Sequence, residues 1–152
     1  MLMEEIIYHY VFRTYKGRSI LTDPETIEFL YKTFINVSLA KGFKIIASKI
    51  MEDHVHCLIS FDSKHRPDYV VRMIKGISSR EFFKAFKTNR LVYRKLWGRS
   101  YFGEQINEDK FNIVINYINN QTDKSGIDKK CTKNNRNREF YSQVPSLKRR
   151  KA

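Results

Sequence analysis

The sequence predicts an α+β domain with a ferredoxin-like (split β-α-β, RRM-like) fold, in which helices cover one face of an antiparallel sheet. The first observation is the order of the predicted elements, β-α-β-β-α-β followed by one more helix. The second is the length, because 152 residues fit one domain and can close a hydrophobic core. The third is the composition, since 41% hydrophobic and 14% aromatic residues exclude a chain that is disordered throughout.

The first half of the chain is predicted to form one strand and one helix. Residues 6–15 are rich in aromatic and β-branched side chains, and alternation places Ile6, Tyr8, Tyr10 and Phe12 on one strand face. Residues 22–25 combine an N-cap oxygen, an early proline and an acid, which is typical of a helix start. This helix is expected to end at 41–42, where a glycine follows a lysine. Its expected apolar stripe is Ile27, Leu30, Tyr31, Phe34, Val37 and Leu39.

The second half supplies the remaining strands and helices. Residues 43–50 and 54–61 are predicted as strands joined by a tight turn. A long helix is expected from Tyr69 to about Phe86, and part of the stretch 90–102 is expected to form a fourth strand. The last helix is predicted from about Glu108 to Gln121. Because the helices of such a fold cover one face of the sheet, we expect the opposite face to be open and free to carry a site.

The charge balance indicates an anionic partner. The chain has 29 Lys+Arg against 16 Asp+Glu, a formal net charge of +13. This excess favours nucleic acid, with an anionic membrane as the second choice. Residues 122–152 hold 10 Lys+Arg and 3 Asp+Glu, so we predict a domain at 1–124 and a flexible basic tail at 125–152. A reduced, cytoplasmic protein is expected, because no apolar run, secretory signal or cysteine framework is found.

A pair of histidines forms the first candidate site. His54 and His56 lie two apart on a predicted strand, so their rings project from the same face roughly 6–7 Å apart. Two imidazoles at this spacing can converge on one cation or one phosphate oxygen. Val55 and Cys57 are expected to point into the core. A surface strand that carries two histidines without a function is an equally good interpretation of this motif taken alone.

The last helix supplies the second candidate site. Tyr117 and Gln121 are four residues apart and therefore share a helical face. A tyrosine at helical spacing is more often a core residue than a nucleophile. A phenol has a free pKa of about 10 and needs a nearby cation to attack at neutral pH. The paired histidines could hold that cation, so the two weak signals make chemical sense together.

These residues, taken in order, carry a resemblance to a known family. The chain resembles the HUH-superfamily single-tyrosine transposases of small insertion sequences, the transposase A family of the IS-two-hundred kind. The resemblance runs from about residue 6 to 124 and rests on several segments in sequence order. These segments are Tyr8-His9-Tyr10-Val11-Phe12, Met51-Glu52-Asp53-His54-Val55-His56-Cys57-Leu58-Ile59-Ser60, Ile74-Lys75-Gly76-Ile77-Ser78-Ser79, Leu96-Trp97, Tyr101-Phe102 and Tyr117-Ile118-Asn119-Asn120-Gln121.

The resemblance implies the function in some detail. It makes Tyr117 the nucleophile, and His54, His56 and Gln121 the ligands of Mg²⁺ or Mn²⁺. It implies single-stranded DNA with subterminal hairpins, a covalent 5′-phosphotyrosine intermediate, and a homodimer in which one subunit's tyrosine helix completes the other's histidine pair. No membrane partner is implied, and a prokaryotic protein would be nucleoid-associated when bound to DNA. The candidate DNA contacts are Arg72, Lys75, Arg80, Lys84, Trp97 and Arg99.

Two alternatives stay open at this point. A domesticated relative with the same chemistry would act on hairpin repeats of the genome. A non-catalytic RRM-like module would stack RNA bases on aromatic residues of its sheet. The RNP1 motif of such modules is absent from the sequence, which weighs against the second alternative.

Overall fold

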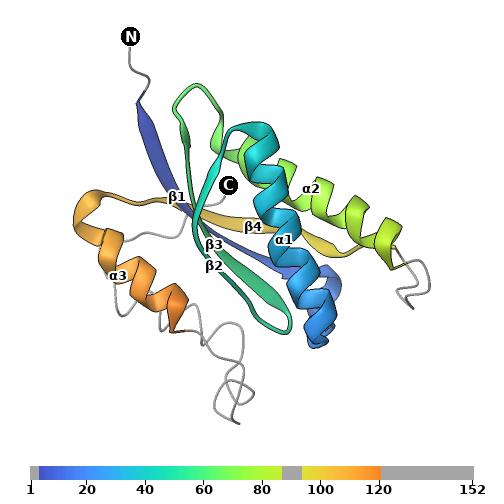
Figure 1. Cartoon of the computed structure of the whole chain (residues 1–152). Helices are drawn as coiled ribbons and strands as arrows, with labels where there is room; N and C mark the ends of the chain where they lie inside the picture. The colour runs from blue at the N-terminus through green and yellow to red at the C-terminus, as the bar shows by residue number, and fades with distance from the viewer. Residues whose placement is uncertain (1–3, 87–93, 121–152) are drawn as a thin grey trace.

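The computed structural model describes residues 4–86 and 94–120 and confirms the predicted α+β class. Four antiparallel strands form one sheet in the order β2-β3-β1-β4. Figure 1 shows α1 and α2 side by side across one face of the sheet, with α3 on the other side. The elements are β1 (Glu5–Thr14), the short 3-10 helix η1 (Tyr15–Gly17), α1 (Pro24–Lys41), β2 (Lys44–Ile50), β3 (His54–Asp62), α2 (Pro67–Ala85), β4 (Trp97–Gln105) and α3 (Glu108–Asn119).

Helix α1 begins and ends where the sequence predicts. The side chain of Asp23 accepts a hydrogen bond from the Thr26 amide at 3.0 Å, and Gly42 ends the helix with a φ of 82°. The predicted stripe is wrong at one position, because Leu39 is 74% exposed. A helix turns by about 100° per residue, so the stripe through Phe34 continues at positions 37 and 38 and leaves Leu39 pointing outward.

The main core lies between the sheet and helices α1 and α2. Tyr10 and Phe12 of β1 and Val55 and Cys57 of β3 are buried there, as the alternation predicted. Trp97, the first residue of β4, packs edge-to-face on Phe12 with ring centroids 4.8 Å apart. The expectation that Trp97 contacts DNA finds no support in this position. Its ring is only 7% exposed, and its indole nitrogen donates to Ser78 Oγ at 2.9 Å.

Lys75 of α2 is half-buried beside the same layer, and its predicted role in DNA binding stays a prediction. Its ammonium donates to the carbonyl oxygens of Gly98 and Ser100 at 2.8 and 3.2 Å, and the carbonyl of Arg99 lies at 3.4 Å. The pairing of β4 with β1 shifts register at this point, between Phe12 and Thr14. Lys75 therefore binds main-chain oxygens where the ladder is interrupted and ties α2 to β4.

The second face of the sheet is covered, contrary to the expectation of an open face. Apolar residues of α3 are spaced at three and four positions, and this stripe packs on β2 and β3. A second core cluster forms there from Leu58, Ile106, Val114, Tyr117 and Ile118. Within the described residues, no helix is long and apolar enough to cross a membrane. Gln121 and the predicted tail at 125–152 lie outside the described residues.

Candidate active site

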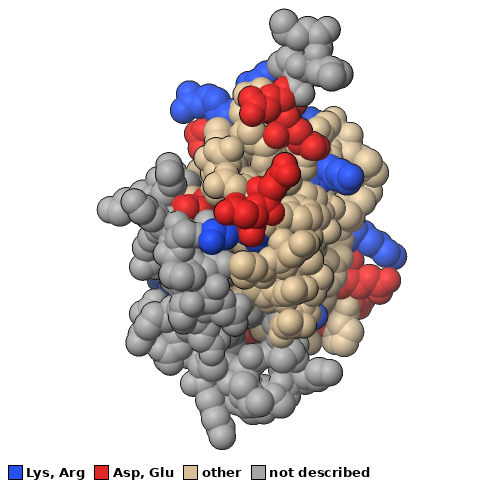
Figure 2. Space-filling view, turned by 90° about the vertical axis from the view of Figure 1, so that its left-hand side faces the viewer, with Lys and Arg blue, Asp and Glu red and all other residues tan. Residues whose placement is uncertain are grey.

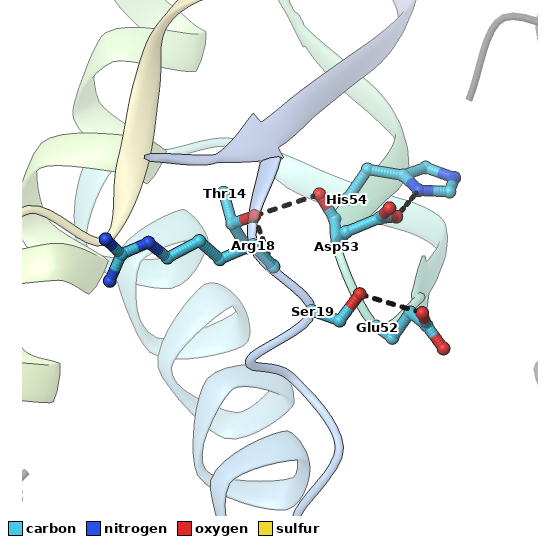
Figure 3. A network of polar contacts seen from close by, with 6 residues as sticks. All are labelled: Thr14, Arg18, Ser19, Glu52, Asp53 and His54. Carbon is cyan, nitrogen blue, oxygen red and sulfur yellow. Dashed lines mark hydrogen bonds and ion pairs between the residues drawn. The ribbon is translucent and has the colours of Figure 1, made fainter. Parts of the chain in front are cut away.

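The turn between β2 and β3 holds the first histidine in a fixed orientation. His54 opens β3, and its Nδ1 lies 2.7 Å from Asp53 Oδ1, with both residues almost fully buried. The main chain of this turn is tied to the segment after β1. Thr14 N donates to Asp53 O at 3.0 Å, and Ser19 Oγ donates to Glu52 Oε2 at 2.8 Å. Figure 3 draws the contact of the Thr14 hydroxyl with Asp53 O, that of Ser19 with Glu52 and that of Asp53 with His54, all at this turn.

The second histidine is held by a third, His9 of β1. His9 Nε2 lies 3.2 Å from His56 Nδ1, and the two rings are nearly parallel with centroids 5.4 Å apart. Complete burial lowers the pKa of His9 to about 3, so its ring is neutral at physiological pH. A neutral His9 can accept a proton donated by His56 Nδ1. In that tautomer, His56 Nε2 carries a lone pair.

The donor set suits a metal ion. Asp53 engages Nδ1 of His54 and His9 engages Nδ1 of His56, so a cation bound by both rings would be held through Nε2 of each. The ring centroids of His54 and His56 are 5.0 Å apart. Within residues 4–86 and 94–120, no group of three or more His, Cys, Asp or Glu side chains is arranged to hold a metal. The two imidazoles by themselves would supply two ligands of such a site.

Tyr117 of α3 lies next to this pair within the same chain. Its ring meets the His56 ring edge-to-face, with centroids 5.6 Å apart, and it is 5% exposed. Val114 and Ile118 anchor the helix on the sheet to either side of it. The structure thus brings together three of the four residues predicted to carry the chemistry: His54, His56 and Tyr117.

Comparison with known proteins identifies the family. Residues 2–121 match the family model described as "Transposase IS200 like". The chain belongs to the IS200-like transposase family. The ISDra2 transposase TnpA of Deinococcus radiodurans is 28% identical over 123 residues, which cover 79% of this chain and 86% of that protein. The resemblance inferred from the sequence is thereby confirmed, and the chain is a transposase of the single-tyrosine kind.

Solved structures agree with this assignment. A candidate transposase from Deinococcus radiodurans R1 matches with a TM-score of 0.63 and 26% identity, over 79% of this chain and 93% of that one. The REP-associated tyrosine transposase, solved bound to a REP hairpin, has the same fold with a TM-score of 0.58 and 18% identity. That match covers 78% of this chain and 67% of that one. The RNA-binding alternative finds no support in this transposase fold, because Tyr10 and Phe12 face the helices and not an open sheet surface.

Three of the other predicted DNA contacts lie away from the histidine pair. Arg72, Arg80 and Lys84 are exposed on α2, which covers the opposite face of the sheet (Figure 1). Each lies within 4 Å of an acid on the same helix, either Asp68 or Glu81. Arg99 is exposed on β4. Their role in DNA binding stays a prediction, and none of those on α2 belongs to the transposase's histidine site.

Two residues that orient the site were missed by the sequence reasoning. From the sequence, His9 has no predicted role of its own, and Asp53 is placed only in the turn between two strands. The signal for Asp53 was its place directly before the histidine pair. The signal for His9 was the alternation on β1, which puts it on the face opposite the aromatic residues and therefore on the face of His54 and His56.

The two ends of the sheet differ in charge. Where β1 begins and β3 ends, Glu4, Glu5 and Asp62 line a shallow pocket together with Lys44. Figure 2 views the molecule from the α3 side and shows acidic side chains gathered over the upper half of this face. The other end, where β1 ends and β3 begins, carries Arg13, Lys16, Arg18, Lys49 and Arg99. The second end, which also carries His54, is therefore the more basic of the two.

Proposed function

We propose that this transposase cleaves and rejoins single-stranded DNA through a covalent 5′-phosphotyrosine on Tyr117, with Mg²⁺ or Mn²⁺ at its histidine pair. The observation that carries the proposal is the contact of the Tyr117 ring with His56, whose other side is held by His9. A tyrosine packed only for stability has no need of two oriented imidazoles beside it. The family assignment supports transposase chemistry at this site.

Each residue has a definite part in the reaction. His54, His56 and Gln121 would hold the ion, which when bound would polarise the phosphate and favour the phenolate form of a nearby phenol. Tyr117 Oη attacks the phosphorus and loses its proton to solvent, while the P–O3′ bond breaks and the departing 3′ oxygen takes up a proton. A 3′-OH from another DNA end then attacks the phosphotyrosine, which restores Tyr117 and joins the strands. No nucleotide cofactor is required, because the covalent link conserves the bond energy.

Hairpins are the proposed recognition element. The REP-associated tyrosine transposase, which shares the fold, was solved with a REP hairpin. A domesticated copy and a mobile-element copy of this enzyme would use the same site on different DNA. Inverted repeats immediately beside the gene would support a mobile element, and dispersed hairpin repeats elsewhere in the genome would support the domesticated alternative.

Substitution of Tyr117 tests the proposed chemistry. The Tyr117→Phe variant keeps the ring that packs on His56 and removes only the hydroxyl, so it should lose the SDS-stable protein–DNA adduct and keep DNA binding. The matched control is Tyr101→Phe, since Tyr101 is a half-buried tyrosine of β4 that packs on Tyr10. The control should form the adduct at the wild-type rate. An adduct formed by Tyr117→Phe would assign the nucleophile to another residue.

A homodimer is proposed because strand exchange must hold two DNA ends and the site contains one nucleophile. In this structure Tyr117 lies against His56 of its own chain, which favours a site completed within each subunit; the family resemblance favours a shared one. Mixing Tyr117→Phe and His54→Ala subunits separates the two arrangements. Rescue, with the adduct on the His54→Ala subunit, supports shared sites. Absence of rescue in proven heterodimers supports sites within one chain.

A further inference from the structure

The histidine pair is flanked by two cationic side chains that the sequence reasoning did not single out. Arg13 of β1 stands directly opposite His54 in the β1–β3 ladder. Lys49 of β2 stands directly opposite His56 in the β2–β3 ladder. Side chains directly opposite each other in an antiparallel pair have Cβ atoms about 4.5–5.5 Å apart. One cation therefore lies on each side of β3, beside a different histidine.

Alternation places both cations on the face of the site. Phe12 precedes Arg13 and is buried under the helices, and Val55 follows His54 and is buried there too. Ile50 follows Lys49 and packs in the same core. Arg13 and Lys49 consequently project from the side of the sheet that carries His54 and His56. Arg13 is exposed and Lys49 is half-buried.

The backbone that carries Arg13 is fixed relative to the site. Thr14, the next residue, binds Asp53 O through its amide at 3.0 Å, and its hydroxyl lies 3.3 Å from the same oxygen. Leu21 N donates to Glu52 O at 2.9 Å (the turn is drawn in Figure 3). These bonds hold the end of β1 against the turn before His54, so the base of the arginine side chain keeps its place when substrate binds.

We propose that Arg13 and Lys49 bind the DNA backbone on either side of the histidine pair and hold the reacting phosphodiester across β3. This inference rests on the proposed function, because it takes the histidine pair as the place of cleavage. A guanidinium presents two parallel N–H donors that match the oxygens of a phosphate, and an ammonium acts as a compact point charge. The two carboxylates of the turn before β3 have partners of their own, Asp53 with His54 and Glu52 with Ser19.

The first experiment does not depend on cleavage. Binding of a dT20 oligonucleotide is measured by fluorescence anisotropy on the full chain carrying Tyr117→Phe, over a range of salt concentrations. Arg13→Gln and Lys49→Gln should each weaken binding by about five- to tenfold and lower the salt slope by about 0.7, the value for one phosphate of a single strand. Arg13→Lys should retain more affinity than Arg13→Gln. The matched controls are Lys44→Gln, at the far end of β2, and Lys32→Gln, on α1; both should change affinity less than twofold.

The second experiment locates the contacts. On an oligonucleotide cut by the wild-type protein, single methylphosphonates neutralise the cleaved linkage or one of its two neighbours. Each methylphosphonate should weaken binding to the Tyr117→Phe protein. In the double variants that also carry Arg13→Gln or Lys49→Gln, the methylphosphonate at one of these linkages should cause no further loss of affinity. The inference would be overturned if the control substitutions weakened dT20 binding as much as Arg13→Gln and Lys49→Gln do. It would also be overturned if every methylphosphonate still weakened binding in both of these variants. A wild-type protein that cuts no DNA would instead overturn the proposed function, while the dT20 result would still decide whether these two cations bind DNA.

Discussion

Replacing Asp53 by alanine removes the partner that fixes the ring of His54. The contact is short, 2.7 Å between Asp53 Oδ1 and His54 Nδ1, and the two residues are buried, 7% and 4% exposed. Without the carboxylate, the ring is free to rotate and to place the proton on Nε2, the nitrogen proposed to bind the metal. The prediction is therefore a loss of metal affinity while the main chain of the turn, held by Thr14, keeps its conformation.

The expected loss of Mn²⁺ affinity follows from the loss of the contact between Asp53 and His54. Loss of an outer partner of a metal-binding histidine typically lowers affinity by about 10- to 100-fold, or about 1.4–2.7 kcal/mol. Calorimetric titration of the full chain with Mn²⁺ should show this loss for Asp53→Ala. The Asp53→Asn variant keeps an acceptor oxygen and loses only the charge, so its Mn²⁺ affinity should fall by an amount near the lower end of this range. The Mn²⁺ concentration that half-saturates adduct formation should rise by the same factor in each variant.

The neighbouring residue offers a matched control. Glu52 lies in the same turn. Its carboxylate accepts a hydrogen bond from Ser19 Oγ and points away from His54 (Figure 3). Glu52→Gln should therefore bind Mn²⁺ as the wild-type protein does. If Asp53→Ala bound Mn²⁺ as tightly as Glu52→Gln while both remained folded, the orienting role of Asp53 would be refuted.

Three further predictions concern the second layer of the site, the core and the tail. His9→Phe fills nearly the same volume but removes the nitrogen beside His56. The affinity for Mn²⁺ should therefore fall by about tenfold in the same calorimetric titration, and an unchanged affinity would contradict the orienting role of His9. Burial lowers the pKa of Lys75 from 10.5 to about 8, so between these values the unfolded chain holds a proton that the native protein has released, and the contribution of Lys75 to the free energy of unfolding rises with pH. This contribution should be roughly half of the limiting 1.4 kcal/mol per pH unit, since the ammonium is partly solvated and bonded to carbonyls. Burial raises the pKa of Cys57 and of Tyr10, which act in the opposite direction, so urea unfolding at pH 8 and 10 should show the Lys75 contribution as a difference in pH dependence: the wild type and the exposed control Lys84→Met should gain stability relative to Lys75→Met. Deleting residues 122–152 removes a net charge of +7, so it should weaken binding of single-stranded DNA and flatten its salt dependence, and a truncated chain with the wild-type slope would remove the tail from DNA binding.

The sequence by itself determined the fold class and the order of the elements. Aromatic and β-branched residues alternate along β1, and Asp23 and Gly42 bound α1 at the expected places, because strand alternation and helix capping depend on neighbouring residues. The His-x-His spacing also fixed a local geometry, since side chains two apart on a strand must share a face. The prediction of a same-face histidine pair is confirmed for that reason.

Tertiary structure decided which distant residues meet. His9 and His56 lie 47 positions apart, and Arg13 and His54 lie 41 apart, so only the register of β1 on β3 brings them together. Trp97 and Lys75 looked like DNA-binding residues because aromatic and basic side chains often are. The burial of Trp97 and the contacts of the half-buried Lys75 depend on α2 crossing the start of β4, which no local pattern encodes.

The position of α3 is the largest difference between the sequence prediction and the structure. Its apolar stripe predicted an amphipathic helix but not the surface on which that helix would pack. An open sheet face carrying Leu58 and Ile7 would leave apolar surface in water, and α3 buries that surface by packing over it. Because the same helix carries Tyr117, burial of this apolar surface also brings the tyrosine to His56. The histidine pair and Tyr117 could be predicted as candidate reacting groups from the sequence. Only hydrophobic packing between distant segments places them side by side.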